Sequence, residues 1–537
     1  MLPDAAQYVE PDEVDLLVFE AIVPKNHYLR KVMQAIDFER CRELLVSCYC
    51  KDLGRRAIEP ILLLKLEFLE FHYNLSDREV ISAAQVNMAF RYFLHLSRRS
   101  PLPHHTMLTH FRNRLGVEKH QQVFDDVVGQ AREHGLVKDR LRLKDATHII
   151  ANIAVPSTIR LVGQTRKQLL LAAKPFAPQR VAEEEARADA IRLATTDASD
   201  KERLLQRVSH LQEVVACVDT LIAGLPASTE LCWQRLQEAL QVAHKVLADR
   251  HNEKQRPKWN QKKDKLISVH DPDARYGWHH GYYYGFVLDV SMDAHSNIIT
   301  AVNMLPANAD EAADATTLIT HEEQTHGNDV AGLSIDGAGF RGELLHEWSD
   351  PQGLNLDVTV PPPAEAEATV FAPEAFKLDA SGETLTCPAG QTTSERVRRK
   401  NDNAWQFCFA DQTCAACPIR SQCQTPQCCR RRRGRRSKRR QGTPSHGRRV
   451  LKNDYEADYQ QARAKAQTAA YQEVRRQHPA IERKLSELVR HHGARHARYR
   501  RQGRVLVHGL LTALVVNVKR IVHFLALPLR AEVVPTG

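Results

Sequence analysis

The fold is decided by the stretch Asp329-Val330-Ala331-Gly332-Leu333-Ser334-Ile335-Asp336-Gly337-Ala338-Gly339-Phe340-Arg341-Gly342. A short apolar run ends in Asp336, and three glycines follow within six residues. This pattern predicts a buried strand that delivers a carboxylate to the carboxyl end of a sheet, followed by an open turn. An ordinary Asp-Gly turn without further function is the alternative. Two distant stretches favour the first interpretation.

The first of these is Lys144-Asp145-Ala146-Thr147-His148-Ile149-Ile150-Ala151, in a predicted strand over residues 141–153. The second is Ile481-Glu482-Arg483-Lys484-Leu485-Ser486-Glu487-Leu488, which has helical spacing. Acids from a strand, a strand end and a facing helix suit two divalent ions about 3.5–4 Å apart, because hard ions prefer carboxylate oxygens. Asp145, Asp336 and Glu482 are therefore the predicted metal ligands. Each acid also has an alternative without function: Asp145 as an ordinary strand residue, Asp336 as a turn residue and Glu482 as a solvated helix residue.

The positive charge of the chain is concentrated in one segment. Nine of the eleven residues from 430 to 440 are cationic: Arg430, Arg431, Arg432, Arg433, Arg435, Arg436, Lys438, Arg439 and Arg440. The formal net charge of +10 falls to 10 − 9 = +1 without them. Such a run predicts phosphate contacts without sequence preference, because no aromatic residue is interleaved for base stacking. A solvated loop is the alternative.

The chain of 537 residues is long enough for several domains. A helical N-terminal DNA-binding domain is predicted over residues 1–130, with a capping box at Ser76–Glu79. Within it, a helix that begins near Thr106 and is closed by Gly116 carries Arg112 and Arg114, which suits DNA docking. A helical bundle with solvated arginines is the alternative.

The rest of the chain alternates between strands and helices. Strands are predicted at 141–153, 282–290, 297–305, 330–336 and 354–360, with helices at 310–321 and 342–348. This order predicts a mixed α/β fold with a sheet of the ribonuclease-H type. The predicted parts are 138–160 and 263–362 for the core, 161–262 for a helical insertion, 363–452 for a linker with cysteines and arginines, and 453–530 for the glutamate helix and C-terminal helices.

Cysteines cluster ahead of the arginine run. Cys387, Cys414, Cys417 and Cys423 offer four thiolates, two of them in a C-x-x-C pair, which predicts a structural zinc site. Cys408, Cys428 and Cys429 are alternates, and an iron–sulfur cluster or unligated thiols remain alternatives. A membrane span is not expected, because the most apolar stretch, residues 505–527, is interrupted by charged and polar residues.

The Asp145 strand, the Ser334–Phe340 turn, and the Ile481–Lys484 stretch leading into Gly493–Arg500 together resemble the DDE transposases of bacterial insertion sequences. The resemblance spans roughly residues 20 to 525 and is closest to the branch with a helical N-terminal domain and a cysteine cluster before the glutamate. It implies a transposase that cuts and joins DNA at the ends of its own element with Mg²⁺ or Mn²⁺, held by the three acids. It also implies double-stranded DNA as partner, a homodimer or higher assembly on DNA, and a bacterial cytoplasmic, nucleoid-associated location.

One departure from the family bears on the site. At the spacings where many relatives have an arginine and a lysine around the glutamate, this chain has His478 and Val489. Glu487 and Glu473 are minor rivals of Glu482 as the third acid. Two further functions remain open: a catalytically inactive, transposase-derived DNA-binding protein, and a ribonuclease-H-like nuclease.

Overall fold

The computed structural model describes residues 9–50, 57–226, 228, 230–252, 264–279, 281–363, 370–379, 381–399, 403–423 and 447–526. The chain divides into two compact units, residues 1–330 with 478–537 and residues 331–477. Both units are built from helices and strands, so the predicted mixed α/β class is confirmed. The six-part division predicted from sequence remains a prediction.

The first unit begins with a helical domain. Its helices are α1 (Glu13–Ile22), α2 (Tyr28–Ala35), α3 (Arg42–Val46), α4 (Pro60–His72), α5 (Asp77–Val86), α6 (Met88–Leu94) and α7 (Thr106–Glu133). The helix α4 has apolar side chains on nearly every side, and almost the whole helix is buried in the domain core. The predicted capping box begins α5, where Ser76 and Glu79 each accept a hydrogen bond from the backbone N–H of the other. Gly116, with φ of 63°, kinks α7 where the sequence predicted a helix end.

A sheet in the same unit is organised around β3 (Tyr282–Asp293). The strand β1 (Arg142–Ile150) lies antiparallel along one edge of β3. The strands β2 (Arg275–Trp278) and β4 (Ile299–Pro306) follow one another along the other edge, also antiparallel. The strands predicted at 282–290 and 297–305 are thus present, and β3 and β4 form an antiparallel hairpin. The helix that follows it, α12 (Ala315–His326), begins five residues later than predicted (315 − 310 = 5).

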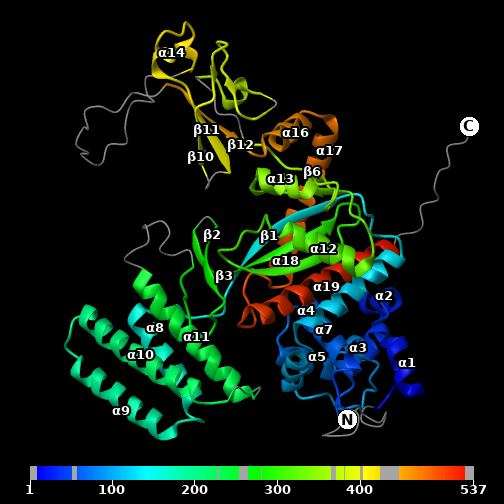
Figure 1. Ribbon diagram of the computed structural model, residues 1–537. Helices are drawn as coiled ribbons and strands as arrows, with labels where there is room; N and C mark the ends of the chain where they lie inside the picture. The colour runs from blue at the N-terminus through cyan, green and yellow to red at the C-terminus, as the bar shows by residue number, and fades with distance from the viewer. Residues whose placement is uncertain are drawn as a thin grey trace, which may run out of the picture. The chain divides into compact units, whose positions relative to one another are not determined.

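Two C-terminal helices, α18 (Pro479–His491) and α19 (Gln502–Ala526), complete this unit. The helix α19 packs against α2, α4, α7 and β4 and forms the centre of the main core (Figure 1). Among the helices that the structure describes, α19 alone is long and apolar enough to cross a membrane, and 83% of its most apolar window is buried inside the protein. That burial is typical of a core helix.

The region of the predicted helical insertion contains four helices. They are α8 (Thr158–Ala173), α9 (Pro178–Ala194), α10 (Asp200–Ala223) and α11 (Leu231–Asn252). Leucines and valines of α8, α10 and α11 form a separate apolar core. A Ser199–Glu202 capping box begins α10.

The second unit contains the parallel pair β5 (Gly332–Ser334) and β6 (Asp357–Thr359), with α13 (Gly342–Ser349) between them in sequence. The helices α16 (Glu456–Ala466) and α17 (Ala469–Gln477) pack beside β6. The cysteine-rich region adds short strands that the sequence did not predict. These are β7 (Lys377–Leu378), β8 (Leu385–Thr386), β9 (Thr392–Thr393), β10 (Arg396–Arg399), β11 (Ala404–Cys408) and β12 (Arg449–Asn453), with the short helices α14 (Asp411–Ala415) and α15 (Arg420–Cys423).

Along the chain, the order of β1, β3, β4, α12, β5, α13, β6 and α18 is the order of elements expected of a ribonuclease-H-like core. The insertion α8–α11 follows β1, and the cysteine-rich region follows β6.

Candidate active site

Asp145 lies in the middle of β1, opposite Val290 of β3. Side chains alternate along a strand, so Leu143, Asp145 and Ile149 share one face. Leu143 and Ile149 belong to the same buried core as residues of α18. Asp145 therefore points to the side of the sheet that α18 covers. Its carboxylate is half-buried, and Oδ1 accepts a hydrogen bond from the backbone N–H of Ala146 at 2.8 Å.

Glu482 lies in the first turn of α18, which packs against β1. The helix is anchored by Ile481, Leu485 and Leu488, whose spacing puts all three on one buried stripe. Glu482 stands on the flank of that stripe and is exposed. Within the described ranges of the chain, its carboxylate has no hydrogen bond or ion pair. The structure thus joins the elements that carry Asp145 and Glu482, and it leaves the Glu482 oxygens accessible.

The two rival acids differ from Glu482 in their surroundings. Glu487 forms ion pairs with Lys484 at 3.0 Å and Lys519 at 2.5 Å. Burial raises the pKa of Glu487, but the hydrogen bond from Lys519 and the charge of Lys484 outweigh it and hold the pKa at about 2. Glu473 pairs with Arg476 at 3.1 Å on the surface of α17. Because both lysines already neutralise Glu487, Glu482 is the better candidate for a metal ligand on α18.

Asp336 belongs to the second unit. The parallel pair β5–β6 continues through Ile335, whose N–H donates to the Thr359 carbonyl at 3.2 Å. Asp336 then caps a 3₁₀ turn, Gly337–Gly339, and its Oδ1 accepts from the Ala338 N–H at 3.1 Å. This is the strand-end carboxylate that the sequence predicted. The meeting of Asp336 with Asp145 and Glu482 remains a prediction.

The turn after Asp336 requires glycine for a reason of space. A Cβ at Gly339 would lie 2.7 Å from Ile335 Cγ2 and 3.3 Å from the ring of Trp348. Arg475 of α17 supports the same strand, since its Nη1 donates to the Ile335 carbonyl at 3.0 Å. Ile335, which precedes Asp336, is thus held both by its close packing against Gly339 and by the hydrogen bond from Arg475.

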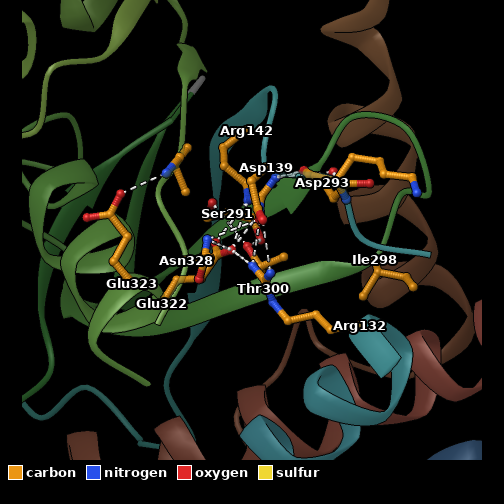
Figure 2. A network of polar contacts seen from close by, with 12 residues as sticks. Arg132, Asp139, Arg142, Ser291, Asp293, Ile298, Thr300, Glu322, Glu323 and Asn328 are labelled. Atoms are coloured by element: carbon orange, nitrogen blue, oxygen red, sulfur yellow. Dashed lines mark hydrogen bonds and ion pairs between the residues drawn. The ribbon is translucent and has the colours of Figure 1, made fainter. Parts of the chain in front are cut away.

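A buried polar network fixes the start of β1, three residues before Asp145 (Figure 2). Arg142 is fully buried and contacts Glu322 of α12 at 2.6 Å and Asp293 of β3 at 3.1 Å. Arg132 of α7 reaches the same Glu322 oxygen at 2.6 Å. Burial alone would raise the pKa of Glu322, but the hydrogen bond and charge of Arg142 lower it to about 2. The network joins α7, α12 and two strands, and no sequence motif predicted it.

A second buried acid, Asp289 of β3, lies on the other face of the sheet. It is opposite Ala146, so it points away from the side of Asp145. Its Oδ1 pairs with Lys144 at 2.9 Å, and Lys144 also donates to the Glu311 carbonyl at 2.5 Å. Burial raises the pKa of Asp289 well above its ordinary value. Its position makes Asp289 part of the sheet's support and excludes it from the face that carries Asp145.

The segment Gly493–Arg500 extends the end of β1. The Ile150 N–H donates to the Arg495 carbonyl at 2.9 Å, and the Ala497 N–H donates to the Ile150 carbonyl at 2.9 Å. Arg498 reaches back to Glu70 of α4 at 2.9 Å. Through Arg498 and these backbone hydrogen bonds, the segment therefore connects the helical domain to the sheet.

The two arginines of α7 that were predicted to contact DNA, Arg112 and Arg114, lie in different surroundings. Arg112 is only 9% exposed and pairs with Asp77 at 2.6 Å and with Glu70 at 3.0 Å. Its guanidinium is nearly buried and already paired with carboxylates of α4 and α5, so this geometry does not favour the phosphate contact, which stays a prediction. Arg114 is exposed and lies 4.2 Å from the ring centre of Tyr49. The arginine run, residues 430–440, lies outside the described residues.

Four cysteines predicted to bind zinc line one small cavity. Cys387, Cys414, Cys417 and Cys423 surround it together with Phe376 and other apolar residues. Burial raises the pKa of the Cys423 thiol. Over the part of the chain that the structure describes, no three His, Cys, Asp or Glu side chains stand close enough to hold a metal ion as placed. The alternate Cys408 is buried in β11, and Cys428 and Cys429 lie outside the described residues.

Two stretches of the chain match known protein families. Residues 17–114, most of the helical domain, match a family described as a transposase domain, DUF772. Residues 386–522 match a family described as a transposase DDE domain. The second match contains Glu482 and the four cysteines. No solved structure matches the chain.

Proposed function

We propose that this chain, two stretches of which match transposase families, is a DDE transposase of an insertion sequence that cuts DNA at the ends of its element and joins the resulting 3′ hydroxyls to target DNA. The observation that carries the proposal is the packing of α18 against β1, with Asp145 on the covered face of the strand and an accessible Glu482 on the helix. Asp336, at the end of β5, supplies the third carboxylate.

Carboxylate oxygens are hard donors, so this set of residues fits Mg²⁺ or Mn²⁺. Asp145, Asp336 and Glu482 would hold the ions. When bound, a pair of such ions activates the attacking oxygen and stabilises the leaving oxygen of a phosphodiester.

The protein's own contribution is to hold the carboxylates in place. The Arg142–Glu322 pair fixes the start of β1, and the Gly493–Arg500 segment fixes its end. The Ala338 N–H orients the Asp336 carboxylate. Rigid support matters because small misplacements of catalytic groups cost large factors in rate.

DNA is the proposed partner in two roles, as element ends and as target. Arg114 and the arginine run at 430–440 are proposed phosphate contacts, and a homodimer or higher assembly is proposed to hold two ends at once. A cytoplasmic, nucleoid-associated location follows from this role. We also propose one structural zinc ion at Cys387, Cys414, Cys417 and Cys423, because all four thiols line the same cavity.

The test is incubation of the full chain with labelled end DNA, an unlabelled target and Mg²⁺. Joined products support the proposal, whereas nicks without joining indicate a nuclease and a mobility shift without cleavage indicates a DNA-binding protein. Asp336→Asn is expected to abolish cleavage and keep DNA binding. Cleavage retained in that variant would remove Asp336 from the mechanism.

A further inference from the structure

We infer that the outer face of α1 (Glu13–Ile22) binds the same face of a second copy of this chain, with the two helices antiparallel. The usual distribution of polar and apolar side chains is reversed in this helix. Asp15 and Phe19 are its buried residues, and the Asp15 carboxylate accepts a hydrogen bond from the Arg98 backbone N–H at 3.1 Å. The helix packs chiefly against α6, and Figure 1 shows it at the edge of the helical domain.

The outward face of α1 is apolar. Val14, Leu17 and Ala21 are spaced three and four residues apart, so they form one stripe on the side opposite the buried residues. Leu16 and Ile22 flank this stripe. The four large side chains are all more than half exposed, and Leu17 is 71% exposed. Single apolar residues are common on protein surfaces, but a continuous apolar stripe on one helix indicates an interaction site.

The charges at the two ends of α1 favour a second copy as the partner. Glu10 and Glu13 lie at the N-terminal end, Lys25 follows the C-terminal end, and all three are exposed. Within the part of the chain that the structure describes, none of the three forms an ion pair. Glu20, by contrast, is already paired with Arg30 at 2.6 Å. An antiparallel pair puts the acidic end of each helix beside the lysine of the other, whereas a parallel pair would bring like charges together.

The spacing of the stripe fits a two-fold axis at Leu17. Val14 lies three residues before Leu17 and Ala21 lies four residues after it. An axis at Leu17 therefore places each Val14 against the Ala21 of the other copy, and the same residues are used on both sides, as a two-fold interface requires. The antiparallel arrangement also puts the partly positive N-terminal end of each helix beside the partly negative C-terminal end of the other.

The contact is short, so the pairing is weak and reversible in the free protein. The helix has 10 residues, which correspond to a length of about 15 Å. Two helices of this length bury less than the roughly 1,200 Å² of the smallest stable interfaces. The proposed function brings two chains together on two DNA ends, which raises their effective concentration. The inference goes beyond that function, because it names the protein surface through which the two copies meet without DNA.

The test is sedimentation equilibrium of the full chain, without DNA or added divalent ions, over a wide range of protein concentration. The wild type is expected to shift from the monomer towards twice the monomer mass as the concentration rises. Leu17→Glu is expected to weaken the dimer by about tenfold or more, because it places two like charges at the axis. Leu193→Glu is the matched control, since Leu193 of α9 is also 71% exposed, and it should dimerise like the wild type.

Charge reversal tests the antiparallel arrangement. Glu13→Lys and Lys25→Glu are each expected to weaken the dimer by roughly two- to tenfold, since an exposed pair occurs twice in a two-fold interface. The variant with both changes should dimerise like the wild type.

Three results would overturn the inference: a wild type that stays monomeric, a Leu17→Glu variant that dimerises like the wild type, or a double charge reversal no tighter than the single ones. Because the experiment contains no DNA, its failure is separate from a failure of the chain to cut or join DNA with Mg²⁺.

Discussion

Replacing Glu322 with glutamine tests whether the buried network supports β1. Glu322 is fully buried and bonded to both Arg142 and Arg132. Its pKa is lowered from 4.5 to about 2, and one pKa unit corresponds to about 1.4 kcal/mol, so the ionised carboxylate contributes about 3 kcal/mol at neutral pH. Removing one member of a buried ion pair typically costs about 3–5 kcal/mol, which agrees. Glu322→Gln is therefore expected to lower the free energy of unfolding of the first unit by about 3 kcal/mol.

The assay is urea unfolding followed by circular dichroism, with hydrogen exchange of the β1 amides as a local measure. Asp189→Asn is the control, since the Asp189–Arg192 pair is exposed at 69% and 68% and is worth at most about 0.5 kcal/mol. Because the folded pKa of Glu322 is depressed, its contribution is complete above pH 4.5 and is lost as the pH falls towards about 2. The difference between wild type and Glu322→Gln should shrink over that range. A shift no larger than that of Asp189→Asn at pH 7 would refute the reasoning.

Three further predictions concern the acids, a buried histidine and the cysteines. Glu482→Gln should reduce cleavage of end DNA by about a thousandfold or more, whereas Glu487→Gln should retain cleavage, because Lys484 and Lys519 already neutralise Glu487. Equal loss of cleavage in both variants would contradict the assignment. Burial lowers the pKa of His508 to about 3, so the free energy of unfolding should fall as the pH decreases from about 6.5 towards 3. The same pH dependence in His508→Gln would contradict this role of His508. Purified protein should contain one zinc ion per chain by atomic emission. The zinc should be lost in the Cys414→Ser variant and kept in the Cys217→Ser control. Zinc retained in Cys414→Ser would exclude the Cys414 thiol as a ligand.

Much of the local structure could be predicted because short-range patterns dictate it. The Ser76–Glu79 capping box, the β3–β4 hairpin and the strand end at Asp336 all follow from side-chain type and spacing alone. Gly116 was correctly singled out, but the chain continues as a helix after the kink, because apolar residues beyond it rejoin the same core.

The surroundings of single charged residues were harder to predict. Arg112 looked like a surface cation, yet its partners Glu70 and Asp77 come from other helices, and local sequence does not encode such pairs. The same limit hid the Arg142–Glu322 network, whose members are 322 − 142 = 180 residues apart. The arginines of the Gly493–Arg500 segment also depend on the fold, since their partners lie in α4 and β1.

The strands of the cysteine-rich region were missed because they are short. The strands β7, β8 and β9 have two residues each, too few for an alternating pattern. Their cohesion comes instead from a small apolar core that includes Phe376, Phe407 and Phe409. The sequence marked the cysteines but gave no sign of the sheet around them.

The most direct test is a crystal of the full chain with end DNA, grown with Mn²⁺ and measured for anomalous scattering. The account predicts Mn²⁺ within about 2.0–2.2 Å of carboxylate oxygens of Asp145, Asp336 and Glu482, and a second ion about 3.5–4 Å from the first. Ions bound elsewhere, with those three side chains too far apart to share one, would contradict it.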